Sequence, residues 1–325
     1  MDFKDTFAVV ADEFEAVNGF IMGNLDSNVP LVREVGEYIV SAGGKRLRPL
    51  MALLSAKALG YDGERHVDVA AIIELLHTAT LLHDDVVDES SLRRGRPTVN
   101  AVWGNAASVL VGDFLISRAL QLTVAIGNLH ILDIFASSTN VISEGEVWQL
   151  LNCHDPDITE AHYLRVIHDK TAKMFEAAAR TGAALAVAEG VDVALEEALA
   201  CYGRHMGIAF QLIDDVLDYQ GSAAELGKNV GDDLAEGKPT LPLIYTLAHG
   251  DQAKAARVRE VVRSGGLDDL QEVIALVRAS GGLEYTLEKA REQTQLAVAQ
   301  LEQVPASAYR QALADLAIQA VARHF

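Results

Sequence analysis

Two short runs of acidic residues carry the most specific chemical signal in this sequence. Residues 84–88 read DDVVD and residues 214–218 read DDVLD, each within an apolar stretch of helical period. Residues four apart lie on one face of a helix, so each run presents two carboxylates one turn apart. Such carboxylates repel unless a cation lies between them, and Mg²⁺ binds carboxylate together with phosphate oxygens. We therefore expect a magnesium site, with the ligands Asp84, Asp88, Asp214 and Asp218 and with Asp85 beside the first pair.

A single acidic run would fit a solvated helix face as well as a metal site. The recurrence of the pattern favours the metal, because two helices that face each other could bring both runs to one metal cluster. A metal that bridges carboxylates to a ligand implies an anionic ligand, and diphosphate suits Mg²⁺ because its oxygens complete the coordination shell.

Basic residues accompany both acidic runs. Arg93 and Arg94 directly follow the first run, and the rigid fork of arginine suits phosphate oxygens. Lone lysines are usually solvated surface residues, but three of them could clamp a diphosphate in this setting: Lys170 in HDKTAKMFE, and Lys228 and Lys238 in ELGKNVGDDLAEGKPTLP.

A second basic site lies upstream, where residues 43–49 read GGKRLRP. The glycines let the backbone approach an anion, and the helix expected to begin near Pro49 adds the positive end of its dipole. No acidic run accompanies this loop, which suggests a phosphate group bound without metal. The alternative is a basic helix cap.

The elements that must position these residues are helices. Apolar residues recur at three and four over residues 10–25, 70–89, 158–188 and 195–220, and almost nothing alternates like a strand. The sequence has 325 residues, 50% of them hydrophobic, and shows no linker or repeat that would divide it. We expect one all-α domain over residues 1–325.

The composition also limits the partners and the location. A formal net charge of -19 argues against binding to nucleic acid. No signal peptide is visible, and Asp113 and Arg118 interrupt the most apolar segment, so we expect no membrane span and a cytoplasmic protein.

Five motifs in this order and spacing resemble the trans-isoprenyl diphosphate synthases: GGKRLRP, LLHDDVVDESSLRRGRPT, KTA, FQLIDDVLDY and GKNVGDDLAEGKPTLPL. They cover roughly residues 30–250. ELLHTATLLHDDVVDES and EGEVWQLLN most resemble the bacterial long-chain members, octaprenyl diphosphate synthases above all, which make the quinone side chain. The resemblance implies an antiparallel helix bundle around a deep central cavity and a homodimer formed through helices near NAASVLVGDFLISRAL.

The resemblance also assigns roles to residues. About three Mg²⁺ ions would bind the allylic diphosphate, for instance farnesyl diphosphate, through the aspartates. The groups implied for that diphosphate are Arg93, Lys170, Thr171, Gln211, Lys228 and Lys238. The groups implied for isopentenyl diphosphate are Lys45, Arg48, His77 and Arg94. The implied catalytic residues are Asp84, Asp85, Asp88, Lys170, Asp214 and Lys228, and the product would be delivered to a membrane.

The length of the product depends on the helix face that precedes Asp84. Ala79 and Thr80 lie there and are small, whereas the short-chain members of the family carry bulky aromatics that close the tunnel. A floor on neighbouring helices could include Leu122, Thr123 and Phe135, although plain core packing explains each of these residues as well. Eight or nine isoprene units both stay open, as does the preferred allylic primer.

Three alternatives remain at this point. A class I terpene cyclase usually replaces the second aspartate motif and does not need GGKRLRP, and a noncatalytic subunit of the same fold would be expected to lose one motif. A shorter-chain prenyl diphosphate synthase would keep every motif and differ only in its tunnel.

Replacing Ala79 by Tyr tests the tunnel assignment. The ring would lie about one helical turn from Asp84, so the product should shorten to roughly three or four isoprene units while consumption of the short primer continues. Chromatography of products made with labelled isopentenyl diphosphate measures this. A folding defect would instead lower all products together, because overpacking costs about 1–3 kcal/mol without selecting a chain length. An unchanged long product from a well-folded variant would place the tunnel elsewhere.

Overall fold

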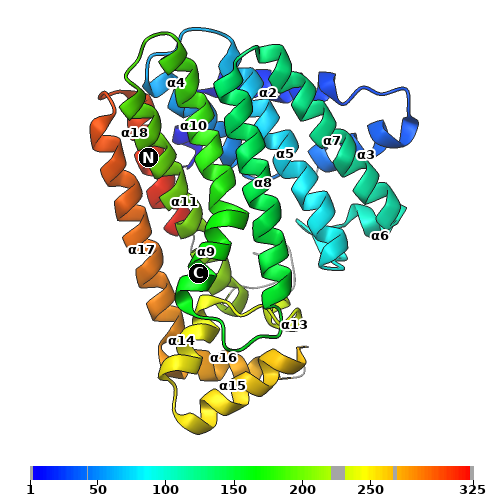
Figure 1. Cartoon of the computed structure of the whole chain (residues 1–325), viewed down its shortest axis with the longest axis vertical. Coiled ribbons are helices and arrows are strands. Elements are labelled where there is room, and N and C mark those ends of the chain that lie inside the picture. The colour runs from blue at the N-terminus through cyan, green and yellow to red at the C-terminus, as the bar shows by residue number, and fades with distance from the viewer. Residues whose placement is uncertain (1–2, 42, 221–230, 266–268, 323–325) are drawn as a thin grey trace. The chain divides into compact units, whose positions relative to one another are not determined.

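The structure is a computed structural model that describes residues 3–41, 43–220, 231–265 and 269–322, and it is almost entirely helical (Figure 1). The expectation of an all-α fold is confirmed. In chain order the elements are α1 (Phe3–Ala8), α2 (Ala11–Asn24), α3 (Pro30–Ser41), α4 (Leu47–Ala58), α5 (Arg65–Val87), β1 (Leu92–Arg93), β2 (Arg96–Pro97), α6 (Val99–Trp103), α7 (Asn105–Ile126), α8 (Leu129–Asn152), α9 (Glu160–Ile167), the π turn η1 (His168–Ala172), α10 (Lys173–Ala188), α11 (Val193–Gln220), α13 (Asp232–Ala235), α14 (Leu241–His249), α15 (Gln252–Ser264), α16 (Leu270–Ser280), α17 (Gly282–Gln300), the short 3-10 helix η2 (Leu301–Gln303) and α18 (Ala308–Val321).

The chain forms two compact units, which are described separately below. The first unit comprises Met1–Ser138, Met174–Gly203 and Val298–Leu316. The second unit comprises Thr139–Lys173, Arg204–Ala297 and Ala317–Phe325. The expectation of a single domain over residues 1–325 stays a prediction.

The core of the first unit forms around α4 and α5. Nearly every face of α4 is buried, because α2 and α5 pack against it. Gly182 in α10 lies so close to α4 that a Cβ atom at this position would be 2.2 Å from the Ala52 carbonyl oxygen. The sequences of these helices are therefore apolar on nearly all sides, as expected for helices that other helices surround.

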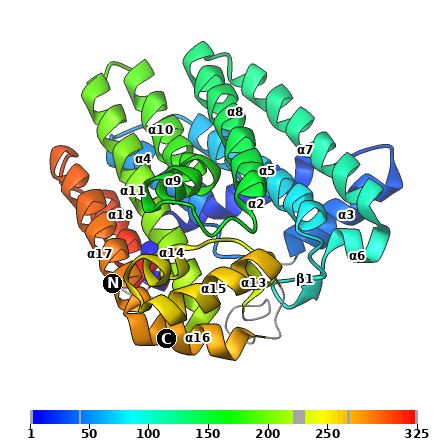
Figure 2. The same cartoon turned by 60° about the horizontal axis from the view of Figure 1, so that its bottom comes forward.

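A small β-hairpin follows α5 and differs from the purely helical expectation. Its strands pair Leu92 with Pro97 and Arg93 with Arg96, and Figure 2 shows the first strand near α6. Arg94 and Gly95 form the turn with φ values of +53° and +73°. Two consecutive positive φ angles are those of the tight hairpin turn that matches strand twist. Pro97 ends the hairpin, and the next helix begins at Val99.

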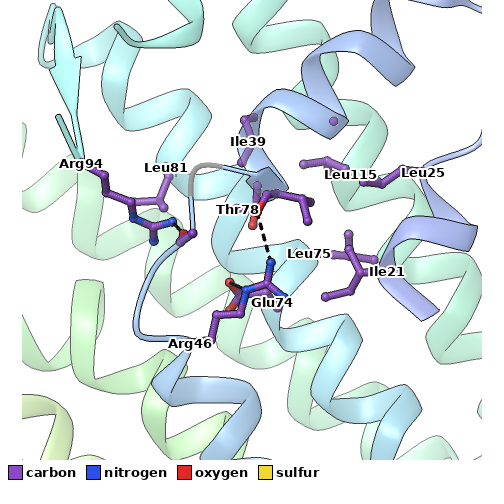
Figure 3. A pocket seen from close by; sticks show the side chains of 13 residues that line it. Ile21, Leu25, Ile39, Arg46, Glu74, Leu75, Thr78, Leu81, Arg94 and Leu115 are labelled. Atoms are coloured by element: carbon purple, nitrogen blue, oxygen red, sulfur yellow. Dashed lines mark hydrogen bonds and ion pairs between the residues drawn. The ribbon is translucent and has the colours of Figure 1, made fainter. Parts of the chain in front are cut away.

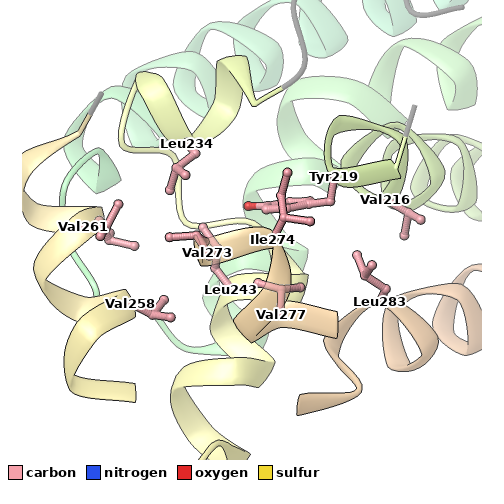
Figure 4. Packing of buried hydrophobic residues seen from close by; sticks show 11 residues of the cluster. Val216, Tyr219, Leu234, Leu243, Val258, Val261, Val273, Ile274, Val277 and Leu283 are labelled. Atoms are coloured by element: carbon pink, nitrogen blue, oxygen red, sulfur yellow. The ribbon is translucent and has the colours of Figure 1, made fainter. Parts of the chain in front are cut away.

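The second unit has a compact apolar core beneath the end of α11. Val216 and Tyr219 of α11 pack there against buried side chains of α13 to α17 (Figure 4). In both Figure 1 and Figure 2 the helices α14, α15 and α16 lie side by side, and they pack against one another. The hydroxyl groups of Tyr219 and Thr240 are 3.2 Å apart. This packing fixes the last turns of α11, where the second acidic run lies.

A π turn interrupts the long helix expected over residues 158–188. Residues His168–Ala172 form the π turn between α9 and α10, and Thr159 caps α9 by accepting a hydrogen bond from the His162 amide. The backbone of α8 approaches this turn closely: a Cβ atom at Gly145 would be 2.6 Å from the backbone nitrogen of Lys170. Such turns widen a helix locally and are frequent at functional sites.

Helix α7 is long and apolar enough to span a membrane by length and composition, although Asp113 and Arg118 were expected to disqualify it. A single helix of this kind is weak evidence for a membrane span. Several large apolar side chains of α7 are exposed, among them Leu110 at 66% and Val124 at 65%.

Candidate active site

The first acidic run lies at the C-terminal end of α5 in the first unit. Asp84 occupies the last turn and Asp88 caps the helix, with the Asp88 amide donating to the Asp84 carbonyl at 2.8 Å. These carboxylates repel each other, and the negative end of the helix dipole also disfavours each of their charges, by about 0.3–1 kcal/mol. A cation at this end of α5 would therefore relieve two unfavourable interactions at once.

Asp85 is placed differently from its two neighbours. It is 4% exposed, and its Oδ1 accepts hydrogen bonds from Nε and Nη2 of Arg93, both at 2.7 Å. Its carbonyl accepts hydrogen bonds from the amide of Ser90 and the side-chain amide of Asn100. Asp85 thus ties the end of α5 to the hairpin and holds the guanidinium of Arg93 beside the acidic run.

The basic loop and the hairpin arginine come together in the same unit. Arg94 donates a hydrogen bond to the Gly43 carbonyl, and a Cβ atom at Gly44 would lie 2.6 Å from the Arg94 guanidinium carbon. Gly44 also has a φ of +136°, which residues with a side chain rarely adopt, so glycine is favoured where the hairpin meets the loop. Nη1 of Arg48 lies 3.1 Å from Nε2 of His77, and the Arg48 guanidinium lies 4.2 Å from the centre of the Phe175 ring. Lys45 lies exposed in the same loop.

The structure thus brings Arg48, His77 and Arg94 to one region, as the family resemblance implied for isopentenyl diphosphate. Burial and the nearby Arg48, Arg94 and Arg93 guanidiniums keep the pKa of His77 well below its usual range. His77 is therefore neutral near pH 7, and Nε2 accepts the hydrogen bond that Arg48 donates.

The second acidic run lies at the C-terminal end of α11, in the second unit. Asp214 is partly buried, whereas Asp215 is buried and accepts hydrogen bonds from the Tyr163 hydroxyl and from Nε2 of Gln211. Burial, with the Asp233 carboxylate nearby, raises the pKa of Asp215. The Thr171 hydroxyl donates to Oε1 of Gln211 at 3.0 Å, so these hydrogen bonds set the orientation of the amide.

Asp218 takes a position that the helical spacing did not predict. Its side chain has no exposed surface, and Oδ2 accepts a hydrogen bond from the Asp233 amide at 3.3 Å. The Asp218 carbonyl accepts a hydrogen bond from the Gly231 amide at 3.1 Å. These contacts attach α13 to the end of α11, so Asp218 has a structural task besides any part in metal binding.

The lysines expected at a diphosphate are held by acidic or amide groups of the second unit. Nζ of Lys170 lies 2.5 Å from Oε2 of Glu146 and 2.6 Å from Oε1 of Gln149, both on α8. Lys238 pairs with Glu236 and lines one pocket together with Gln211, Asp215 and Asp233. Lys228 lies outside the described residues.

The residues expected to set product length all lie in the first unit. Ala79, Thr123 and Phe135 are buried, while Thr80 and Leu122 are partly buried. The Thr80 and Thr123 hydroxyls donate to the carbonyls of His77 and Ala119, both at 2.8 Å, which satisfies these polar groups within their own helices. Their part in a product tunnel stays a prediction.

The donor atoms fit a hard divalent cation. Among the residues that the structure describes, no group of three or more His, Cys, Asp or Glu side chains is arranged to hold a metal alone. Each unit instead offers carboxylates at a helix end, and Mg²⁺ in proteins commonly binds one or two carboxylates together with substrate phosphates. That both acidic runs act on one metal cluster stays a prediction, because they belong to different units.

Sequence reasoning missed the groups that hold the basic residues. Glu74 interrupts the apolar run AAIIELL, and Glu146 and Gln149 are three residues apart in EGEVWQLLN. An acidic residue within an otherwise buried helix face was the signal available for Glu74, because such a group needs a cationic partner. For Glu146 and Gln149, helical spacing placed both on one face, but nothing in the sequence identified Lys170 as their partner.

The lowered pKa of His77 makes stability depend on pH. The unfolded chain binds a proton near the ordinary value of 6.5, whereas the folded chain resists it, so stability is full above that value and falls as the pH decreases. Replacing His77 by Gln keeps an acceptor for Arg48 and removes the titration. Urea unfolding from about pH 8 to about pH 5 should show a smaller loss of stability in His77→Gln than in the wild type.

His249→Gln, at an exposed position of α14, controls for the substitution itself. Superimposable pH profiles for the wild type and His77→Gln would contradict the assignment.

Comparison with known proteins agrees with this arrangement of motifs. The polyprenyl synthetase family model matches residues 29–277. An octaprenyl diphosphate synthase from Haemophilus influenzae is 50% identical over 323 residues, which cover 99% of this chain and 97% of that protein. A geranyl-diphosphate-specific all-trans-nonaprenyl-diphosphate synthase from Rhodobacter capsulatus is 50% identical over 318 residues, with 97% of each chain covered.

A solved structure shares the fold. The crystal structure of a polyprenyl synthase from Caulobacter crescentus, complexed with calcium and isoprenyl diphosphate, superposes with a TM-score of 0.95 at 43% identity. The match covers 99% of this chain and 98% of that chain. The fold is therefore the all-α isoprenoid synthase fold, and the chain belongs to the polyprenyl synthetase family.

Proposed function

We propose that this protein is a long-chain trans-polyprenyl diphosphate synthase, which adds isopentenyl diphosphate repeatedly to an allylic diphosphate until eight or nine units are joined. The observation that carries the proposal is that the first unit contains two different groups of charged side chains. One is the pair Asp84 and Asp88 at the end of α5, which suits a diphosphate bound through metal. The other joins Arg48, His77 and Arg94, which suits a diphosphate bound directly. A condensation of two diphosphates needs both.

The allylic diphosphate is assigned to the acidic runs and the lysines. The chemistry that bound magnesium supplies is neutralisation of the leaving diphosphate. About three Mg²⁺ ions are proposed, with Asp84, Asp88 and Asp214 as principal ligands and Asp218 behind them. Asp85 holds Arg93 in place through their 2.7 Å contacts. The further groups proposed for this diphosphate are Lys170, Thr171, Gln211, Lys228 and Lys238.

Isopentenyl diphosphate is assigned to Lys45, Arg48, His77 and Arg94. The arginines offer planar forks to the phosphate oxygens, and a neutral His77 can orient Arg48 without adding charge. The carbon–oxygen bond of the allylic diphosphate breaks with both electrons going to diphosphate. The double bond of isopentenyl diphosphate attacks the resulting allylic cation, and loss of a proton, proposed to go to the departing diphosphate, restores a double bond. The cation survives only where water is excluded.

Chain length and assembly complete the proposal. The small side chains of Ala79 and Thr80 leave room for a long product, which would serve as the side chain of a quinone. We also propose a homodimer through α7, supported by its exposed apolar residues Leu110, Leu120 and Val124. The enzyme is proposed to be cytoplasmic and to deliver its apolar product to a membrane.

The test is incubation of the purified full chain with labelled isopentenyl diphosphate and farnesyl diphosphate, followed by separation of products by length. Label should appear in products of eight or nine units with Mg²⁺, vanish with chelator and return when Mg²⁺ is restored, while helical circular dichroism persists. Consumption of the allylic diphosphate alone would indicate a cyclase. Binding without turnover would indicate a noncatalytic subunit, and full activity in chelator would refute the metal assignment.

A further inference from the structure

The first arginine of GGKRLRP, Arg46, faces into the protein. The side chain of Arg46 is 12% exposed, whereas Lys45 in the same loop is exposed. Arg48, two residues further on, faces His77 and the Phe175 ring. The side chains of the three basic residues of this motif therefore point in different directions.

Three helices hold the guanidinium of Arg46. Nη1 donates a hydrogen bond to Oδ1 of Asn18 in α2, and Nη2 donates to the Val40 carbonyl in α3 at 3.3 Å. Nε lies 3.9 Å from Oε1 of Glu74 in α5 (Figure 3). Arg46 itself has a φ of +43°, in the left-handed region that is unfavourable for a residue with a side chain. The contacts of the side chain hold this unfavourable backbone in place.

Arg46 and Arg94 line the same small cavity with Glu74 (Figure 3). The cavity measures about 20 Å³, enough for about one water molecule. One end of the cavity is apolar, formed by Ile21, Leu25 and Leu115.

The carboxyl group of Glu74 faces this cluster of arginines. It is buried, and among the residues that the structure describes Oε2 has no hydrogen-bond partner. Burial raises the pKa of Glu74 overall, although the Arg46, Arg48 and Arg94 guanidiniums act to lower it. Glu74 therefore lies within the field of all three arginines.

We infer that Asn18, Arg46 and Glu74 form an internal clamp that positions the loop carrying Lys45 and the first turn of α4, which carries Arg48. Through the Gly43 carbonyl the clamp also positions Arg94. These three residues are positioning residues, since none of them is assigned to touch the substrate. The inference rests on the proposed function, in which this loop binds isopentenyl diphosphate. Loosening the clamp would let the loop and Arg94 move, which would weaken the binding of isopentenyl diphosphate alone.

The decisive variant is Asn18→Ala, because it removes one contact of Arg46 and changes no charge. Arg46→Ala would leave Glu74 buried without its partner and could unfold the chain. The KM for isopentenyl diphosphate should rise about tenfold, as expected for loss of one hydrogen bond to a charged group. The KM for farnesyl diphosphate and kcat at saturating isopentenyl diphosphate should stay within about twofold.

Hydrogen exchange supplies a readout independent of turnover. Amides of residues 43–50 should exchange faster in Asn18→Ala, while those in the middle of α5 should not change. Asn18→Asp keeps an oxygen acceptor for Arg46 and should restore both the KM and the protection. Arg65→Ala is the matched control, because Arg65 pairs with Asp68 at the exposed start of α5.

The outcomes separate the clamp from the proposed function. If the wild type does not turn over isopentenyl diphosphate, the proposed function fails. If the wild type is active and Asn18→Ala has an unchanged KM and unchanged exchange at residues 43–50, the clamp is refuted while the function stands. Asn18→Ala could also raise the KM for both substrates and lower the thermal stability. If Asn18→Asp did not restore these properties, the defect would be a general structural one, and the clamp would also be refuted.

Discussion

Like charges gather at two places in this protein and repel one another there. Carboxylates accumulate at the C-terminal ends of α5 and α11, where the helix dipole already disfavours negative charge. Guanidinium groups accumulate between the loop at residues 43–48 and the hairpin. Folding alone does not favour either accumulation, because separated charges would be better solvated. Each becomes favourable when a ligand of opposite charge binds.

The protein offsets part of this repulsion with its own groups. Asp85 neutralises Arg93, and Glu74 lies in the field of three arginines. In the second unit, Tyr163 and Gln211 donate hydrogen bonds to Asp215, while Glu146 holds Lys170. These partners orient the charged groups without filling the places proposed for substrates. The resulting cost in stability is typical of sites prepared for a charged ligand.

The parts of the site that local rules govern could be predicted from the sequence. The acidic runs, the glycine-rich basic loop and the long helices depend on residue type and on a period of three to four. The hairpin was missed because its strands have only two residues each and its turn is Arg-Gly, instead of the Asn-Gly or Asp-Gly that signals such a turn. The π turn was missed because the periodic pattern continues through it.

Partners distant in the chain could not be predicted. Asp218 was assigned to metal because it is one turn from Asp214, yet its carboxylate is fully buried against the Asp233 amide. Arg46 and Arg48 look equivalent in GGKRLRP, but three helices fix one and His77 with Phe175 fixes the other. Only packing decides which charged groups face each other, and helical period carries no information about packing partners.

The central claim is that one diphosphate binds through metal and the other binds directly to arginines. Calorimetric titration tests it, using isopentenyl diphosphate and an unreactive thio-analogue of the allylic diphosphate, each with Mg²⁺ and with chelator. We predict that isopentenyl diphosphate binds in both conditions and is weakened by Arg48→Ala, whereas the allylic analogue needs Mg²⁺ and is lost in Asp84→Ala. Binding of isopentenyl diphosphate that requires Mg²⁺ and ignores Arg48 would contradict the account.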